Sequence, residues 1–132
     1  MEEPNKTANK PSTKRLLFIE DEPFISELYT RSLTKAGYEV KIVKDGDEAF
    51  NLAKTNTYDI ILLDLMIPSM LGLDILKRLR SEVPDLHAKI IITTNLEQSK
   101  ERRADIEKQA DGYLIKAEVT PRELVEFLGN IK

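Results

Sequence analysis

Residues 60–68 read Ile-Ile-Leu-Leu-Asp-Leu-Met-Ile-Pro. Four apolar residues followed by a carboxylate and a loop predict a buried strand that ends at Asp64. A second apolar run, residues 16–19, ends in the acidic cluster of residues 20–22. A charged side chain at the end of a buried strand is costly unless a partner compensates it. If both strands end at the same side of one sheet, their acidic ends predict a cation site.

The composition is typical of a single globular domain. The 132 residues suffice for one hydrophobic core without covalent staples. A net charge of −3 with both signs mixed argues against nucleic acid or an anionic membrane as a direct partner. The absence of cysteine excludes disulfides, thiolate metal sites and a thiol nucleophile. There is no apolar run of about 20 residues and no signal-peptide pattern at the start, so a cytoplasmic location is expected.

Two regions differ in pattern. Residues 1–13 contain only two apolar residues and predict a disordered tail, whereas residues 14–132 alternate strand and helix and predict one domain. The expected strands are residues 15–20, 39–43, 59–64, 89–93 and 112–116. The first, third and fourth are continuous apolar runs that suit the inside of a sheet, and the second and fifth suit its edges.

Helices fill the gaps between these strands, and five βα units predict a parallel α/β sheet with helices on both faces. The first helix should begin at Pro23 and end before Gly37. Asp45-Gly46 could form a hairpin turn, but residues 48–53 are typical of a helix. The fourth helix, residues 97–109, has eight charged residues and only two apolar ones, so we expect it to be the least stable.

In parallel sheets, ligands bind outside the carboxyl ends of the strands. Besides the two acidic clusters, hydroxyls of residues 93–94 follow the fourth apolar run, and Lys116 follows the fifth strand. Asp21 and Asp64 suit a hard divalent cation, while a hydroxyl and an ammonium suit a phosphoryl group. Because a carboxylate can accept a phosphoryl group, the pattern permits an aspartyl-phosphate site with Asp64 as nucleophile.

Each of these residues has an ordinary structural explanation when taken alone. The acidic residues 20–22 would be favourable at the start of a helix. Asp64 could be a turn residue, and Thr94 could cap the helix that follows it. Lys116 would be a solvated surface amine. Only their combination at four strand ends indicates chemistry.

Four segments of the chain resemble the receiver domain of two-component response regulators. They are residues 17–23 (Leu-Phe-Ile-Glu-Asp-Glu-Pro), 62–68, 92–95 (Ile-Thr-Thr-Asn) and 110–116 (Ala-Asp-Gly-Tyr-Leu-Ile-Lys). The resemblance extends over about residues 14–132. It implies a flavodoxin-like, doubly wound (βα)5 fold with a five-stranded parallel sheet of order 2-1-3-4-5.

The resemblance also implies roles for the residues at the strand ends. Asp64 would accept a phosphoryl group from a sensor histidine kinase or a histidine phosphotransfer protein. Mg²⁺ or Mn²⁺ would be bound by Glu20, Asp21, Asp64 and the backbone carbonyl of Met66. Lys116 would pair with the phosphoryl oxygens.

A switch is implied as well. Thr94 would move toward the phosphoryl group, and the Tyr113 ring would then turn inward; Thr93 competes for this role, but the spacing to Asn95 favours Thr94. A downstream protein partner or a second copy would bind the face formed by the fourth helix, the fifth strand and the last helix. The chain would be a phospho-acceptor that assists its own phosphorylation and dephosphorylation rather than an enzyme, and no output domain is expected in it.

Some positions depart from the family pattern. Glu20 stands where aspartate is commoner. Ala117 replaces a proline after the lysine, and because a non-proline cis bond costs about 3 kcal/mol, a trans bond is expected. Leu71 replaces an acidic residue and should start the third helix or form an exposed contact. Met66 and Leu96, at the positions that tune phosphoryl lifetime, are both apolar and predict slow self-dephosphorylation.

Three other classes are weaker alternatives. An aspartyl-phosphate phosphatase or mutase usually has a second acid two residues after the nucleophile, where this chain has Met66. A phosphorylation-independent interaction module usually lacks an acid or the lysine, and neither is missing here. A flavin carrier would need a phosphate-cradling loop after the first strand. The only histidine, His87, is expected to lie on the surface.

Overall fold

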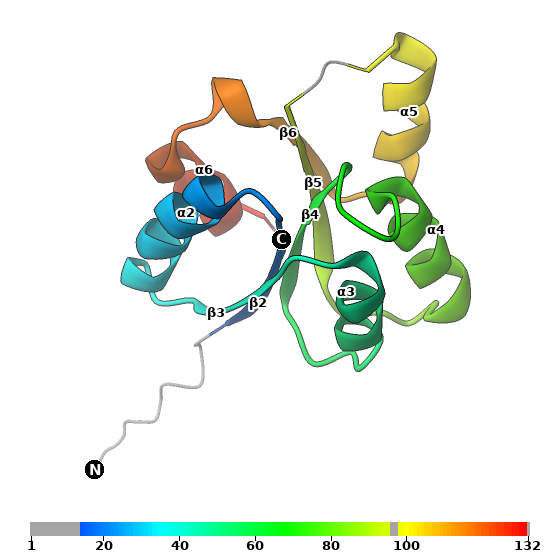
Figure 1. Ribbon diagram of the computed structural model, residues 1–132, viewed down its shortest axis with the longest axis horizontal. Coiled ribbons are helices and arrows are strands. Elements are labelled where there is room, and N and C mark those ends of the chain that lie inside the picture. The colour runs from blue at the N-terminus through cyan, green and yellow to red at the C-terminus, as the bar shows by residue number, and fades with distance from the viewer. Residues whose placement is uncertain (1–13, 96–97, 132) are drawn as a thin grey trace.

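The computed structural model describes residues 14–95 and 98–131, and its centre is a five-stranded parallel sheet (Figure 1). The order across the sheet is β3-β2-β4-β5-β6, which is the expected 2-1-3-4-5 order. The predicted strand bounds are correct to within one residue, and the tail expected for residues 1–13 lies outside the described residues. The strands are β2 (Arg15–Ile19), β3 (Glu39–Val43), β4 (Ile60–Asp64), β5 (Lys89–Thr94) and β6 (Gly112–Ile115).

Five helices cover the two faces of this sheet. α2 and α6 lie on one face, and α3, α4 and α5 lie on the other (Figure 1). A short 3-10 turn, η2 (Lys116–Glu118), follows β6 directly. The helices are α2 (Pro23–Lys35), α3 (Gly46–Ala53), α4 (Gly72–Glu82), α5 (Lys100–Gln109) and α6 (Pro121–Gly129).

The inner strands are apolar on both sides because both faces of the sheet are covered. Leu16 and Phe18 of β2 pack under α2 and α6, whereas Leu17 and Ile19 pack under α3 and α4. Full burial of one such side chain contributes about 2 kcal/mol. The edge strand β3 instead alternates exposed and half-buried residues, as its sequence pattern predicted.

Polar residues at the helix starts decide the turns that follow β2 and β3. The Glu22 carboxylate accepts a hydrogen bond from the Phe24 amide (3.2 Å) at the start of α2. The Asp45 carboxylate accepts one from the Glu48 amide (3.1 Å) at the start of α3, so this segment begins a helix rather than a hairpin. Gly37, with φ at +104°, follows the end of α2 in a conformation that favours glycine.

A glycine brings the loop after β4 back to the strand. A Cβ atom at Gly72 would overlap the carbonyl oxygen of Asp64, so only glycine allows α4 to begin there. The Gly72 amide donates a hydrogen bond to the Leu65 carbonyl (2.9 Å). Leu71 precedes α4 and is 47% exposed. This return fixes the backbone around the end of β4, where Asp64 lies.

Candidate functional site

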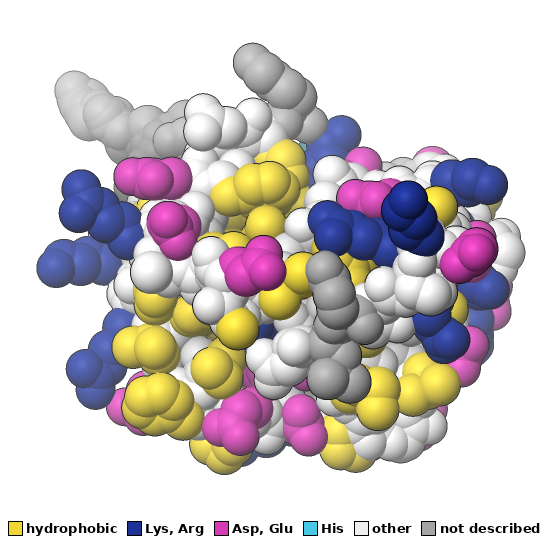
Figure 2. Space-filling view, turned by 90° about the horizontal axis from the view of Figure 1, so that it is seen from above, with side chains coloured by type: hydrophobic (Ala, Val, Ile, Leu, Met, Phe, Trp, Pro, Cys, Tyr) yellow, Lys and Arg dark blue, Asp and Glu magenta, His cyan; other side chains and the backbone are white. Residues whose placement is uncertain are grey.

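The predicted metal and phosphoryl residues meet in one pocket at the carboxyl ends of β2, β4, β5 and β6. The pocket has a volume of about 380 Å³. Figure 2 views the molecule from this end of the sheet, where acidic and hydrophobic side chains lie next to one another. The residues that line the pocket are Glu20, Asp21, Glu22, Asp64, Met66, Thr94, Asn95 and Lys116.

Three carboxylates in this pocket are close enough to share one ion. One oxygen atom from each of Glu20, Asp21 and Asp64 lies within 4.8 Å of the other two. Glu20 and Asp64 are buried, whereas Asp21 is exposed. Such a set of oxygen donors, open to solvent on one side, fits a hard cation that keeps part of its water shell. The donor set therefore suits Mg²⁺ or Mn²⁺.

Lys116 lies between two of these acids. Its ammonium nitrogen is 3.0 Å from Oδ2 of Asp64 and 2.6 Å from Oε1 of Glu20, and only 4% of its side chain is exposed. The alternative of a solvated surface amine is therefore wrong. Burial by itself would lower the pKa of Lys116, but its hydrogen bonds and its charge attraction to Glu20 and Asp64 together outweigh burial and raise the pKa above its ordinary value.

Glu20 is the acid that burial affects most. Loss of solvent raises the pKa of Glu20; the hydrogen bond from Lys116 opposes the rise, and the negative charge of Asp64 adds to it. The Glu22 amide donates to Oε2 of Glu20 (3.1 Å) and fixes the second oxygen. Glu20 therefore holds its proton to a higher pH than an exposed glutamate does.

Asp64 is held by a donor at each oxygen. Oδ1 accepts a hydrogen bond from the Met66 amide (3.1 Å), and Oδ2 accepts one from Lys116. Met66 also lines the pocket, and the residue is 59% exposed. The carboxylate of Asp64 is thus oriented by the loop backbone on one side and by a buried cation on the other.

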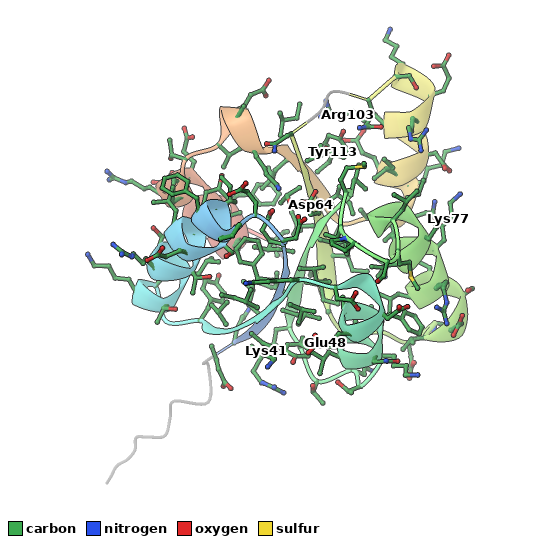
Figure 3. The ribbon with its side chains drawn as sticks, in the orientation of Figure 1. Lys41, Glu48, Asp64, Lys77, Arg103 and Tyr113 are labelled. Atoms are coloured by element: carbon green, nitrogen blue, oxygen red, sulfur yellow. The ribbon has the colours of Figure 1, made fainter. Side chains whose placement is uncertain are left out.

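The structure separates the two candidate switch hydroxyls. Thr93 and Thr94 are both buried, but only Thr94 lines the pocket, because successive side chains of a strand point to opposite faces. Thr94 does not cap α5, since the hydroxyl of Ser99 accepts the hydrogen bond at that helix start. Tyr113 lies outside the pocket lining and is 8% exposed, with the Arg103 guanidinium 4.4 Å from its ring centroid (Figure 3).

Sequence reasoning assigned no role to three residues at or near this site. Glu22 and Asn95 line the pocket, and a search of the residues adjoining the predicted acids and hydroxyl would have found them. Arg103 could not be found in that way, because it is one of several cations on a helix without apolar periodicity. Leu96, which the sequence analysis linked to phosphoryl lifetime, lies outside the described residues.

A larger groove lies between α2 and β3, but its chemistry differs. It has a volume of about 860 Å³ and contains none of the predicted site residues. Among its described lining residues the one acid, Glu27, pairs with Arg31 at 3.0 Å. Pocket size therefore does not locate the acidic site.

Other expectations concern residues outside the pocket. No peptide bond within residues 14–95 and 98–131 is cis, so the bond before Ala117 is trans, as expected. His87 is exposed, and its Nε2 atom lies 3.0 Å from Oδ1 of Asp59. No helix in the described part of the chain is long and apolar enough to cross a membrane.

Comparisons with known proteins agree on one family. A sequence profile described as the response regulator receiver domain matches residues 16–128. The transcriptional regulatory protein CusR of Escherichia coli (strain K12) is 36% identical over 118 residues, which cover 89% of this chain and 49% of that protein. The transcriptional regulatory protein DltR of Streptococcus agalactiae serotype III is also 36% identical, over 89% of this chain and 50% of that protein. This chain thus spans about half the length of these curated relatives.

Solved structures show the same fold. The chemotaxis response regulator CheY4 of Vibrio cholerae matches with a TM-score of 0.80 at 26% identity, over 92% of this chain and 100% of that one. A CheY-like response regulator receiver domain protein from Methanospirillum hungatei JF-1 matches with a TM-score of 0.77 at 27% identity, over 89% of this chain and 92% of that one.

Proposed function

The chain belongs to the family of response regulator receiver domains, and we propose that it is a Mg²⁺-dependent switch that accepts a phosphoryl group on Asp64. The observation that carries this proposal is the buried Asp64 carboxylate, which shares one pocket with two further acids and the buried Lys116 ammonium. The receiver unit comprises residues 14–132. Its donor is a sensor histidine kinase or a histidine phosphotransfer protein in the cytoplasm.

Phosphoryl transfer places few covalent demands on such a site. An oxygen of Asp64 attacks the phosphorus atom of a phosphohistidine, and an O–P bond forms while the N–P bond breaks. The electron pair leaves on the imidazole nitrogen, which takes up a proton. Lys116, already 3.0 Å from Oδ2 of Asp64, would bind the phosphoryl oxygens. Positioning and charge neutralisation supply most of the catalysis in reactions of this kind.

A divalent cation fits the acidic part of the pocket. Glu20, Asp21, Asp64 and the backbone carbonyl of Met66 would hold Mg²⁺, which would supply positive charge to the phosphoryl oxygens. The single positive charge of Lys116 can neutralise only one of the three carboxylates. Without a bound metal ion, the pocket therefore has a net negative charge that repels phosphate. Phosphorylation should therefore depend strictly on a divalent cation.

The switch would extend from the pocket to one face of the molecule. Thr94 lines the pocket, and Tyr113 lies in the next strand of the sheet, β6. The phosphoryl group on Asp64 would attract the Thr94 hydroxyl, and Tyr113 would occupy its inward position. A downstream partner or a second copy of the chain would then bind the face formed by α5, β6 and α6.

The competing functions are less well supported. An aspartyl-phosphate phosphatase needs a second acid two residues after the nucleophile, and the exposed Met66 side chain offers none. An interaction module that works without phosphorylation would not need a buried lysine between two buried acids.

Phosphoramidate, whose N–P bond resembles that of phosphohistidine, provides the test. After incubation with phosphoramidate and Mg²⁺, the intact mass should increase by one phosphoryl group, and hydroxylamine should remove it as it removes other acyl phosphates. The increase should be absent in Asp64→Asn and without Mg²⁺, and present in the control Asp74→Asn, an exposed acid of α4. An unchanged mass in the wild type, or an increase retained in Asp64→Asn, would refute the proposal.

A further inference from the structure

Within the described residues, α5 is held by few side chains, although the Nε atom of Arg80 in α4 donates a hydrogen bond to the Gln109 carbonyl (2.7 Å) at the end of the helix. Ile106 is its only buried side chain among the described residues. Asp105 lies 3.8 Å from Lys77 of α4, but this ion pair is half exposed and contributes little. A helix held so weakly is sensitive to any single further contact.

One such contact is made by Arg103, in the middle of α5. Its guanidinium carbon lies 4.4 Å from the centre of the Tyr113 ring, and 39% of the Arg103 side chain is exposed (Figure 3). The ring itself belongs to the core cluster that also contains Ile106. A guanidinium that lies over an aromatic ring, a contact called the stack below, is attracted by the electrons of the ring face. The inner side of the Tyr113 ring therefore faces the core, and Arg103 covers another side.

This arrangement opposes rotation of the ring. To turn outward, Tyr113 must separate from Arg103 or carry α5 with it. After separation, Arg103 still has an acidic neighbour one turn away, since its Nε atom lies 3.7 Å from Oε1 of Glu107. The stack is thus a contact that can break without leaving a buried charge unpaired.

We propose that Arg103 is the positioning residue that holds the Tyr113 ring inward and couples the ring to α5. The role of this coupling in signalling rests on the proposed function, in which Tyr113 is the aromatic residue of the switch. The stack favours the inward position before any phosphoryl group is present, so part of the molecules already have the ring position of the signalling state. Phosphorylation then adds to an existing bias.

The test follows the Tyr113 ring by NMR in the unphosphorylated, metal-free full chain. Nuclear Overhauser effects (NOEs) between the ring and isoleucine methyl groups of the core report the inward position, and Tyr113→Phe assigns its signals among the four tyrosines. Removing a partly exposed cation–π contact should lower the ratio of inward to outward rings roughly two- to five-fold in Arg103→Ala. Arg103→Lys should be intermediate, because it keeps the charge but loses the planar guanidinium group.

The control is Arg102→Ala, which removes the same type of side chain from the preceding, exposed position of α5. Its Tyr113 NOEs should equal those of the wild type. Unchanged NOEs in Arg103→Ala, or an equal loss in Arg102→Ala, would overturn the proposal. An equal loss of NOEs at Tyr29, which packs on the opposite face of the sheet, would indicate general loosening and would overturn it too. Since no phosphorylation is involved, failure here leaves the proposed function untouched.

Discussion

At the scale of single residues, the pocket depends on the contact of Lys116 with Glu20 and Asp64. Three acids within a few ångströms repel one another, and Lys116 is the cation that reaches two of them. The side chain of Glu20 is one methylene longer than the aspartate that is commoner at this position in the family. The network is therefore a balance between charge repulsion and one buried ammonium.

Removal of this ammonium should be costly unless Glu20 is neutralised first. In metal-free protein, Lys116→Met should lower the free energy of unfolding by roughly 3 kcal/mol, because it leaves buried carboxylates without a cation. In a Glu20→Gln background the loss should be smaller, with a coupling energy of about 1–3 kcal/mol. Urea unfolding in the presence of EDTA measures both values in a double-mutant cycle of four proteins: the wild type, the two single variants and the double variant. Lys77→Met, at an exposed lysine, is the control, and strictly additive losses would contradict the account.

The pKa of Glu20 predicts how metal binding depends on pH. In the proposed metal site the cation would bind ionised Glu20, and the pKa of Glu20 is raised above its ordinary value of 4.5 by burial and by Asp64. Protons therefore compete from a higher pH than at an exposed glutamate, and the affinity for Mg²⁺ should fall as the pH drops through this raised pKa. Isothermal titration with Mg²⁺ at a series of pH values measures this, with Glu39→Gln as an exposed control. An affinity that stays constant down to pH 4.5 would contradict the prediction.

The residues of the pocket could be predicted, but several of their contacts could not. Asp64, Lys116 and the acids of residues 20–22 each follow an apolar run, and parallel strands bring such positions to one edge of the sheet. The stack of Arg103 on Tyr113 leaves no trace in the sequence, because long cationic side chains choose their partners only after the helices are placed.

At the scale of elements, the two helices after β4 and β5 differ in how they are held. α4 buries Ile75, Leu76 and Leu79, whereas α5 buries Ile106. The sequence predicted this difference from the charge of residues 97–109, although the helix begins only at Lys100. What the pattern could not predict is the start of α4, which depends on the close approach of Gly72 to the β4 backbone.

This difference should appear in amide hydrogen exchange. In the unphosphorylated chain, central amides of α5 should exchange at least tenfold faster than those of α4, because local opening of α5 exposes less apolar surface. Phosphorylation, or a phosphate analogue bound at Asp64, should then change the exchange of α5 more than that of α2. Mass-spectrometric exchange of both states measures this. Equal protection of α4 and α5 would contradict the first expectation, and unchanged exchange of α5 would contradict the second.

At the scale of the whole molecule, the sheet order places the acidic pocket close to the proposed partner-binding face. The acidic ends of β2 and β4 lie at the centre of the sheet, while β6, with Tyr113, forms the edge next to β5. The resemblance implied this order, and the sequence pattern indicated independently that the second and fifth strands lie at the edges. A change at Asp64 thus has a short path to the α5-β6-α6 face, through two neighbouring strands.

The measurement that tests this account most directly identifies the phosphorylated residue. After incubation with acetyl phosphate and Mg²⁺, borohydride reduces an acyl phosphate to an alcohol, and peptide mass spectrometry then locates the change. The account predicts homoserine at position 64 and unmodified acids at positions 20 and 21. A reduced residue at any other acid, or no reduced residue at all, would contradict it.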